Sequence, residues 1–142
     1  MEIRKALTKD GIQIHALINK YARQEQMLPR TLLSIYENIR DFYVAVEGDV
    51  VRGSVRVVVR NGVAVIMQLS VDPNQAGRGI GTALLDAVEE RARGEAHKLY
   101  LEVPMLTPQT LRFFIDEGYD PAGILRRHYG GVDWIAFERF LS

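Results

Sequence analysis

A glycine-rich loop lies between an apolar strand-like run and an apolar helix-like run, and this order constrains the fold more than any other feature of the sequence. Val63–Val71, VAVIMQLSV, predicts a central strand that is buried on both faces. Gly77, Gly79 and Gly81 follow it, and Gly81–Arg93 has the apolar spacing of a helix. Backbone N–H groups converge in such a loop, at the positive end of the helix dipole. The segment therefore predicts an anion site that suits a phosphate or pyrophosphate.

Two common nucleotide-binding loops do not fit the spacing of these glycines. The dinucleotide fingerprint G-x-G-x-x-G would need a third glycine where Thr82 or Leu84 stands. A Walker A loop would need Gly-Lys-Ser/Thr, which the segment does not contain. A tight strand-to-helix turn without a ligand is the structural alternative, and three glycines around Arg78 make it the less favoured one.

The rest of the chain alternates between helical and strand patterns. Thr8 or Asp10 is predicted to cap a first helix, and Thr31 to cap a second one. Asn61-Gly62 is a strong signal for a type I′ hairpin. Residues 1–142 are therefore predicted to form one mixed α/β (α+β) domain, with a central sheet and helices on its faces. The remaining predicted elements are strands at Ile3–Leu7, Phe42–Glu47, Val50–Arg60 and Lys98–Val103, one or two strands in the tail, a helix at about Pro108–Glu117 and a loop at Gln24–Arg30.

Composition and charge disfavour several classes of function. The sequence has 18 Lys and Arg against 18 Asp and Glu, so its formal net charge is zero and a nucleic-acid binder, which is normally basic, is not expected. It has no cysteine, which excludes disulfides and cysteine-ligated zinc. His15, His97 and His128 lack the spacing of metal ligands, so no metal site is expected. No apolar run approaches the length of a membrane span, and a cytoplasmic location without membrane contact is expected.

The segment LSVDPNQAGRGIGTALL resembles motif A of the GNAT superfamily of N-acetyltransferases. That motif is a strand ending in Leu-x-Val-x-Pro, then Gln/Arg-x-x-Gly-x-Gly/Ala, then a helix. Its Gln/Arg position falls on Ala76, and Gln75 lies one residue earlier. The residues that match the motif are Leu69, Val71, Pro73, Gly79, Gly81 and Thr82–Leu85.

The resemblance covers most of the chain, at least from Phe42 to Tyr119. EGDVVRGSVRVVV resembles the hairpin before the motif, and KLYLEV followed by TLRFFIDEGYDP resembles the later strand and helix. The N-terminal segment resembles that of N-acetylglutamate synthase-type members. The resemblance implies a central, mostly antiparallel mixed sheet flanked by about four helices. It also implies a splay between the strand Val63–Val71 and the strand Lys98–Val103.

The resemblance further implies that the glycine loop binds the pyrophosphate of acetyl-coenzyme A (acetyl-CoA) through backbone amides. The pantetheine arm would lie in the splay and add strand-like hydrogen bonds to the motif A strand. Arg78 either pairs with a coenzyme phosphate or is a solvated arginine at the loop tip. Thr107 replaces the asparagine that often opens the later helix in the family. The residues expected at the coenzyme are Leu69, Ser70, Val71, Gln75, Ala76, Gly77, Arg78, Gly79, Ile80, Gly81, Thr82, Thr107 and Phe114.

Glu102 is the candidate base for an amine substrate. It matches the glutamate of a Leu-Glu-Val strand in the ribosomal-protein alanine acetyltransferase type, whereas the strand glutamate of many other members is replaced by Val65. The alternative for Glu102 is a carboxylate that makes a structural hydrogen bond or ion pair.

A general acid is less clearly indicated than a base. Phe114 stands where the ribosomal-protein alanine acetyltransferase type has a tyrosine acid. Tyr129 is therefore the candidate acid, and Tyr119 is the second choice because it is expected to pack in the core. Tyr129 and His128 either line the amine pocket or lie in a surface loop of the C-terminal hairpin.

The predicted function is acetyl-CoA-dependent N-acetylation of a primary amine, namely a small metabolite, an amino acid or a protein N-terminus. Direct transfer is expected because the sequence contains neither a Gly-x-Ser-x-Gly motif nor a cysteine nucleophile. The alternative is a non-catalytic coenzyme A-binding sensor or interaction module, and an unrelated nucleotide-binding protein is a third possibility. A homodimer is expected on general grounds alone. The candidates for binding an acidic acceptor are Arg30, Arg40, Arg126 and Arg127, and the alternative is that they are solvated surface arginines.

Overall fold

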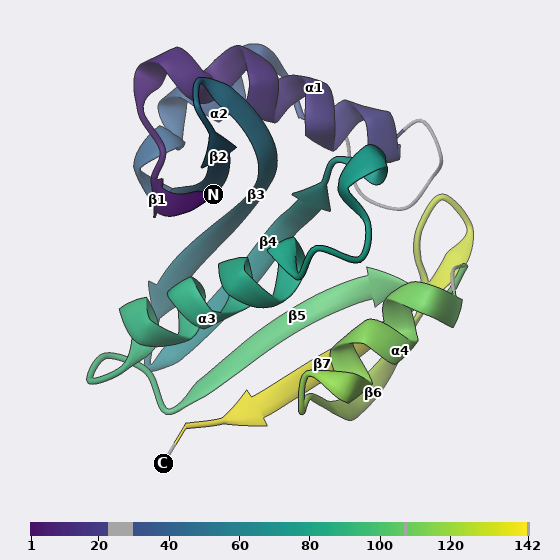
Figure 1. Cartoon of the computed structure of the whole chain (residues 1–142). Coiled ribbons are helices and arrows are strands. Elements are labelled where there is room, and N and C mark those ends of the chain that lie inside the picture. The colour runs from purple at the N-terminus through teal and green to yellow at the C-terminus, as the bar shows by residue number, and fades with distance from the viewer. Residues whose placement is uncertain (23–29, 107, 142) are drawn as a thin grey trace.

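The computed structural model describes residues 1–22, 30–106 and 108–141, and these form a seven-stranded sheet with helices on both faces (Figure 1). The strands are β1 (Glu2–Lys5), β2 (Phe42–Glu47), β3 (Val50–Arg60), β4 (Val63–Val71), β5 (Lys98–Pro104), β6 (Asp120–Tyr129) and β7 (Val132–Phe140). Their order in the sheet is β1-β2-β3-β4-β5-β7-β6. Neighbouring strands are antiparallel except β4 and β5, which are parallel.

The described helices form two pairs, one on each face of the sheet (Figure 1). They are α1 (Gly11–Ala22), α2 (Leu32–Glu37), α3 (Ile80–Ala92) and α4 (Pro108–Asp116). Helices α1 and α2 pack over β2 and β3, whereas α3 and α4 pack over the centre of the sheet. This arrangement confirms the predicted fold class. Within the described ranges, no helix combines the length and the apolar character needed to cross a membrane.

Two local sequence signals act as predicted. Asn61 and Gly62 have φ values of 51° and 78°, and they form the tight turn between β3 and β4. The Thr31 side chain accepts a hydrogen bond from the Ser34 N–H at 3.1 Å and caps α2. Apart from Arg30, the predicted loop Gln24–Arg30 lies outside the described residues.

A core lies on each face of the sheet. The larger one joins α3 and α4 to the centre of the sheet, and Leu84, Val88, Leu99 and Phe137 are fully buried in it. The smaller one lies between α1, α2 and the strands β2 and β3, with Ile14 at its centre. The sheet is therefore covered on one face at its centre and on the other face near β2.

The prediction that Val63–Val71 is buried on both faces is wrong. Ala64 and Ile66 are buried under α3, whereas Val63, Val65 and Met67 on the opposite face are half-buried. The reason is that α1 and α2 bury their apolar side chains mainly against β2 and β3, so this face of β4 is only partly covered. An apolar run alone cannot distinguish complete from partial cover.

The predicted cap of the first helix also differs from the structure. The chain enters α1 through a 3-10 turn at Thr8–Asp10, and the Asp10 carboxylate accepts the N–H of Leu7 at 2.7 Å. Arg4 donates to the same carboxylate at 2.7 Å. Burial acts to raise the pKa of Asp10, but the hydrogen bonds from Arg4 and Leu7 prevail and lower it. The Asp10 carboxylate therefore accepts from the N-cap residue of its own 3-10 turn, and it does not cap a helix that starts after Asp10.

Candidate functional site

Strands β4 and β5 pair over a short stretch and then diverge. In the described residues their register comprises Val63 with Lys98, Ala64 with Leu99, and Val65 with Tyr100. Beyond that point β4 continues along β3 and β5 continues along β7, so the two strands separate (Figure 1). The predicted splay is confirmed, and among the described residues the β4 backbone from residue 66 to residue 71 has no strand partner on the β5 side.

A β-bulge bends β4 within the divergent stretch. Ser54 of β3 lies opposite Ser70, but Arg56 lies opposite Met67, so β4 carries one extra residue there. Gln68 takes the left-handed conformation, with φ of 54°. Bulges of this kind locally increase the twist of a strand and redirect its side chains. The bulge therefore sets the direction of the segment Leu69–Val71.

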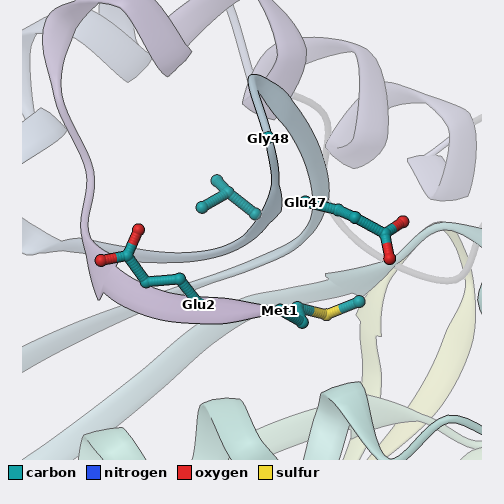
Figure 2. Close-up of a pocket in the computed structure, with 5 residues that line it drawn as sticks. Met1, Glu2, Glu47 and Gly48 are labelled. Carbon is teal, nitrogen blue, oxygen red and sulfur yellow. The ribbon is translucent and has the colours of Figure 1, made fainter.

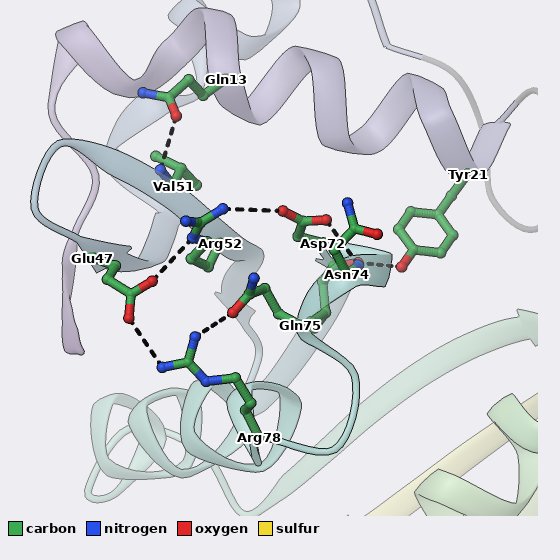
Figure 3. A network of polar contacts seen from close by, with 10 residues as sticks. Gln13, Tyr21, Glu47, Val51, Arg52, Asp72, Asn74, Gln75 and Arg78 are labelled. Atoms are coloured by element: carbon green, nitrogen blue, oxygen red, sulfur yellow. Dashed lines mark hydrogen bonds and ion pairs between the residues drawn. The ribbon is translucent and has the colours of Figure 1, made fainter.

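The end of β4 is held from the α1 side. The Tyr21 hydroxyl donates to the carbonyl of Val71 (Figure 3). Ser70 is buried, with its hydroxyl 3.3 Å from the carbonyl of Gln68. Burial is the main reason why the pKa of Tyr21 is raised. The Gln68 amide, oriented with its oxygen toward Arg30, accepts from Nη2 at 2.9 Å. The sequence indicated neither the contact of Tyr21 with Val71 nor that of Arg30 with Gln68.

Gly77 and Gly79 are required by the backbone conformation of the loop. Their φ values are 82° and 75°, and a Cβ atom at either position would have no described atom within 4 Å. Gly79 is the N-cap of α3, and the Ala83 N–H donates to its carbonyl at 3.0 Å. Ile80, Gly81 and Thr82 are the first residues of α3, and their N–H groups come before this first hydrogen bond of the helix. The glycines thus open a loop whose amides meet at the positive end of α3, as an anion site requires.

Gly81 is present for a different reason. A Cβ atom at Gly81 would lie 3.0 Å from Cζ of Phe113 in α4. This glycine therefore allows α3 and α4 to approach each other closely. The next residue also contributes to the contact between these helices, because the hydroxyl of Thr82 contacts the carboxylate of Glu117.

Arg78 joins the glycine loop to the hairpin of β2 and β3 (Figure 3). Its Nη2 lies 3.0 Å from the carboxylate of Glu47, and its other terminal nitrogen contacts the side-chain oxygen of Gln75. The hydrogen bond and the charge of Arg78 lower the pKa of Glu47, and those of Glu47 raise the pKa of Arg78. Arg78 is thus held in an exposed ion pair with Glu47, and its pairing with a coenzyme phosphate stays a prediction.

Arg52 extends this ion pair into a network. It lies 3.3 Å from Glu47 and 3.4 Å from Asp72, at the end of β4. Asp72 also accepts the Asn74 N–H at 3.0 Å, which caps the 3-10 turn Pro73–Gln75. Figure 3 shows these side chains on the side of the loop that faces β2 and β3. The network links the two ends of the loop to the same hairpin.

Four of the residues expected at the coenzyme need separate comment. The side chain of Ile80 is 4% exposed and that of Phe114 is 3% exposed, and both belong to the core. Only the backbone of Ile80 can take part in the loop, and the assignment of Phe114 to the coenzyme is corrected, because its ring packs among Phe113, Tyr119 and Phe137. Ala76 is exposed beside Gly77. Thr107 lies outside the described residues.

Glu102 is held by two donors. The Tyr100 hydroxyl donates to Oε2 at 2.7 Å, and Nε2 of His128 lies 3.0 Å from Oε1. Burial and the hydrogen bond to Glu102 raise the pKa of Tyr100 to about 12, so its hydroxyl stays protonated at neutral pH. Val65 is aligned with Tyr100 across the pair of strands, so the face that carries Tyr100 and Glu102 is continuous with that of Val65. Glu102 thus lies on β5 just beyond the point where β4 diverges.

The two candidate acids lie elsewhere. Tyr129 is 49% exposed at the end of β6, and in the described part of the chain it is His128 that reaches Glu102. Tyr119 is 2% exposed, and burial is the main cause of its raised pKa. Tyr119 therefore packs in the core, as expected for the second choice. From the sequence, His128 was expected either to line the amine pocket or to lie in a surface loop, and its contact with Glu102 was not predicted.

A separate hollow of about 410 Å³ lies near the chain start, between β1 and the end of β2 (Figure 2). It is lined by Met1, Glu2, Val46, Glu47 and Gly48. Two of these five residues are acidic, which disfavours an anionic ligand. Among the residues that the structure describes, no group of His, Asp and Glu is arranged to hold a metal ion.

Known proteins resemble this chain in sequence. The sequence pattern described as the acetyltransferase (GNAT) family matches residues 10–119. The amino-acid acetyltransferase of Mycobacterium tuberculosis is 33% identical over 95 residues, which is 64% of this chain and 54% of that protein. The chain therefore spans about half the length of this relative.

Solved structures with low sequence identity share the fold. One is N-acetylglutamate synthase from Neisseria gonorrhoeae, complexed with coenzyme A and N-acetyl-glutamate: the TM-score is 0.87 and the identity 22%, over 99% of this chain and 35% of that one. Another is ribosomal-protein-alanine N-acetyltransferase from Brucella melitensis, with a TM-score of 0.85 and 21% identity over 99% of this chain and 100% of that one.

Proposed function

This chain belongs to the acetyltransferase (GNAT) family, and we propose from that membership that it transfers an acetyl group from acetyl-CoA to a primary amine. The observation that carries the proposal is the divergence of β4 and β5 directly before a glycine loop at the head of α3. The open backbone of β4 suits an extended amide-containing arm, and the loop amides suit a pyrophosphate. Similar proteins solved with coenzyme A support this choice of cosubstrate.

The coenzyme would be held mainly by backbone groups. Gly77, Gly79 and the first amides of α3 are proposed to bind the pyrophosphate, and Leu69–Val71 to bind the pantetheine arm. The left-handed φ values of the two glycines and the N-terminus of α3 support the first assignment. Backbone binding also explains why Ala76 can replace the Gln or Arg of the family motif, because the side chain at that position would contribute little.

Glu102 is the proposed base. It lies on the same face as Val65, the position where many family members carry a glutamate, and on the strand that borders the divergence. A protonated amine would lose its proton to Glu102, directly or through water, and its nitrogen would attack the thioester carbon. A backbone N–H of β4 would stabilise the oxyanion, the C–S bond would break, and the thiolate would leave. A thiol pKa near 8.5 means that the thiolate needs little help in leaving at neutral pH.

An amino acid is the acceptor class we favour among the three predicted ones. The relative that is an amino-acid acetyltransferase supports it. The charge near the bulge supports it too, because the half-buried Arg30 lies beside Gln68 and close enough to Arg56 to be affected by its charge. Burial is the larger cause of the lowered pKa of Arg30, and repulsion from Arg56 adds to it. Arg56 is itself paired with Asp41 at 3.1 Å, so it is the positive charge of Arg30 that would favour an acceptor carrying a carboxylate.

Thermal shift and thiol release together test the proposal. Acetyl-CoA should raise the Tm by several degrees at saturation, because a ligand at about 100 times its Kd stabilises the folded state by roughly 2.7 kcal/mol. ATP and NAD should not. Thiol should then be released with at least one amine in a panel of amino acids, small amines and short peptides. Binding without release would favour a coenzyme A-binding module, and equal shifts with ATP or NAD would contradict the coenzyme seat.

Location and assembly remain predictions. We propose a cytoplasmic, homodimeric protein, as the sequence analysis suggested. Cell fractionation checks the first, and light scattering on the purified protein checks the second.

A further inference from the structure

Glu102 is fixed by one donor on each of its carboxylate oxygens. Tyr100 lies two residues before it on the same face of β5, and its hydroxyl donates to Oε2 at 2.7 Å. His128 comes from β6, 26 residues later, and its Nε2 lies 3.0 Å from Oε1. Two donors on different oxygens restrict rotation of a carboxylate about its last bond, and each oxygen keeps a further lone pair. The carboxylate is thus oriented but still able to accept a proton.

His128 reaches Glu102 because β6 is distorted. Leu125 lies opposite Trp134 and Tyr129 lies opposite Val132, so four steps along β6 match only two along β7. At the centre of this irregularity Arg127 takes a left-handed φ of 46°, and its N–H donates to the Asp133 carboxylate at 2.9 Å. A non-glycine residue in this conformation costs free energy, and such residues concentrate at functional sites. The side chain of Asp133 offsets part of that cost, so the distortion is stabilised locally.

The His128 ring is also supported from the side. It packs edge-on against Trp134, with ring centroids 5.4 Å apart and an angle of 70° between the planes. Trp134 is 6% exposed in β7, directly across from Pro104 at the end of β5. The rigid indole therefore limits the positions open to the imidazole, which is itself 41% exposed at the side chain. The irregularity in β6, the Asp133 carboxylate and the Trp134 indole together direct Nε2 of His128 toward Glu102.

We propose that His128 is a positioning residue for Glu102, and that it orients the carboxylate toward the amine by donating from Nε2 while Tyr100 donates from the other side. The proposal rests on the proposed function, in which Glu102 is the base. Proton transfer depends strongly on the placement of the base, and a displacement of about 1 Å can cost on the order of 100-fold in rate.

Four variants test the proposal in an acetyl-CoA and amine assay. Glu102→Gln removes the base, His128→Ala removes the donor, and His128→Gln keeps an N–H donor of similar reach without the acid–base chemistry of an imidazole. His97→Ala is the matched control, because His97 is an exposed histidine just before the opposite end of β5.

The expected results separate positioning from other roles. Glu102→Gln should lower kcat by about 100-fold or more. His128→Ala should lower kcat by about tenfold while the KM for acetyl-CoA changes by less than about twofold. His128→Gln should recover kcat to within about threefold of wild type, because its amide can donate to the same oxygen. His97→Ala should behave as wild type, and all four variants should keep the wild-type Tm within a few degrees.

Three outcomes would overturn the proposal. One is a His128→Ala variant with wild-type kcat beside an impaired Glu102→Gln variant. Another is a His128→Gln variant that is as slow as His128→Ala, which would mean that the imidazole itself transfers a proton. The third is a loss of activity in His128→Ala that is fully accounted for by a loss of folded protein, so that kcat per folded molecule is unchanged.

The contact can also be measured without turnover. In ¹⁵N spectra of the imidazole groups, the Nε2 resonance of His128 should move in Glu102→Gln and stay in place in Glu138→Gln, where a neighbouring carboxylate on β7 is changed instead. An unmoved resonance would contradict the contact and the proposal with it. If no amine is acetylated at all, the proposed function fails, and the spectra still decide whether His128 holds Glu102.

Discussion

Glu47 and Glu102 occupy two ends of the same sheet and receive the same number of donors, but the donors differ in charge. Glu47, at the glycine-loop end, lies 3.0 Å from Arg78 and 3.3 Å from Arg52, both permanent cations. Glu102, at the β5 end, meets a phenol at 2.7 Å and an imidazole at 3.0 Å. A carboxylate between two guanidinium groups stays ionised and serves to link segments. A carboxylate between a phenol and an imidazole has no permanent cation against it, and so it is suited to accept a proton.

We therefore expect the glycine-loop end of the site to bind the coenzyme and the β5 end to carry the acid–base chemistry. At the loop end, backbone amides and an exposed charge network are suited to an anion. At the β5 end, oriented donors without a permanent charge are suited to hold a base. Changes at the loop end should therefore alter coenzyme affinity, and changes at the β5 end should alter turnover. The following experiments test that division, beginning with the largest expected effect.

Gly79→Asp should abolish most coenzyme binding. The new carboxylate would face the loop amides, and repulsion of a pyrophosphate should weaken the Kd of acetyl-CoA by about 100-fold or more. The matched control is Gly94→Asp, because Gly94 has a φ of 83° and open space similar to those of Gly79. Titration calorimetry measures both. Equal affinities in the two variants would remove the anion site from the glycine loop.

Tyr100→Phe should lower kcat and leave coenzyme affinity unchanged. The variant removes the donor to Oε2 of Glu102, and a loss of about fivefold corresponds to one modest hydrogen bond. Tyr43→Phe on β2 is the control, since Tyr43 lies in another part of the sheet. Steady-state kinetics with varied acetyl-CoA separate kcat from KM. A changed KM with an unchanged kcat would place Tyr100 in binding and break the division.

Gly81→Val should destabilise the protein by about 2 kcal/mol, because the added side chain enters space that Phe113 occupies. Phe113→Ala in the same chain should recover part of that loss. Gly123→Val is the control, because a side chain at this exposed strand position has open space. Urea unfolding of the single and double variants gives the coupling. If the coupling is absent, Gly81 has another role, which coenzyme titration of the same variants would reveal.

Glu47→Gln should strengthen coenzyme binding slightly, by a few-fold at low salt. The carboxylate partly neutralises Arg78 and Arg52, so its removal leaves a more positive loop. The effect should shrink as salt is added, because both partners are exposed. Glu90→Gln, on the exposed side of α3, is the control for a lost negative charge. Weaker binding in Glu47→Gln would mean that the ion pair mainly holds the loop in shape.

Predictions from the sequence were most accurate where a signal is local. The Thr31 cap, the Asn61-Gly62 turn and the bounds of β4 depend on residues within a few positions of one another. They were less accurate where a long-range contact decides. Thr8 or Asp10 was predicted to cap the first helix, and in the structure the Asp10 carboxylate accepts from Arg4 and from the Leu7 N–H. Phe114 was assigned to the coenzyme, although its ring packs against Tyr119 and against Phe137 of β7.

The amino-acid sequence by itself determined the order of the elements and the glycine loop, because turn residues, apolar periodicity and backbone permissiveness act over short distances. Only the tertiary structure decided which side chains meet. Arg78 and Glu47 are 31 residues apart, and Glu102 and His128 are 26 residues apart. Each pair forms because strands paired in a particular register bring distant residues together. For Glu102 and His128, an irregularity in that register turns the imidazole toward the carboxylate, and such an irregularity had no sequence signal at Arg127.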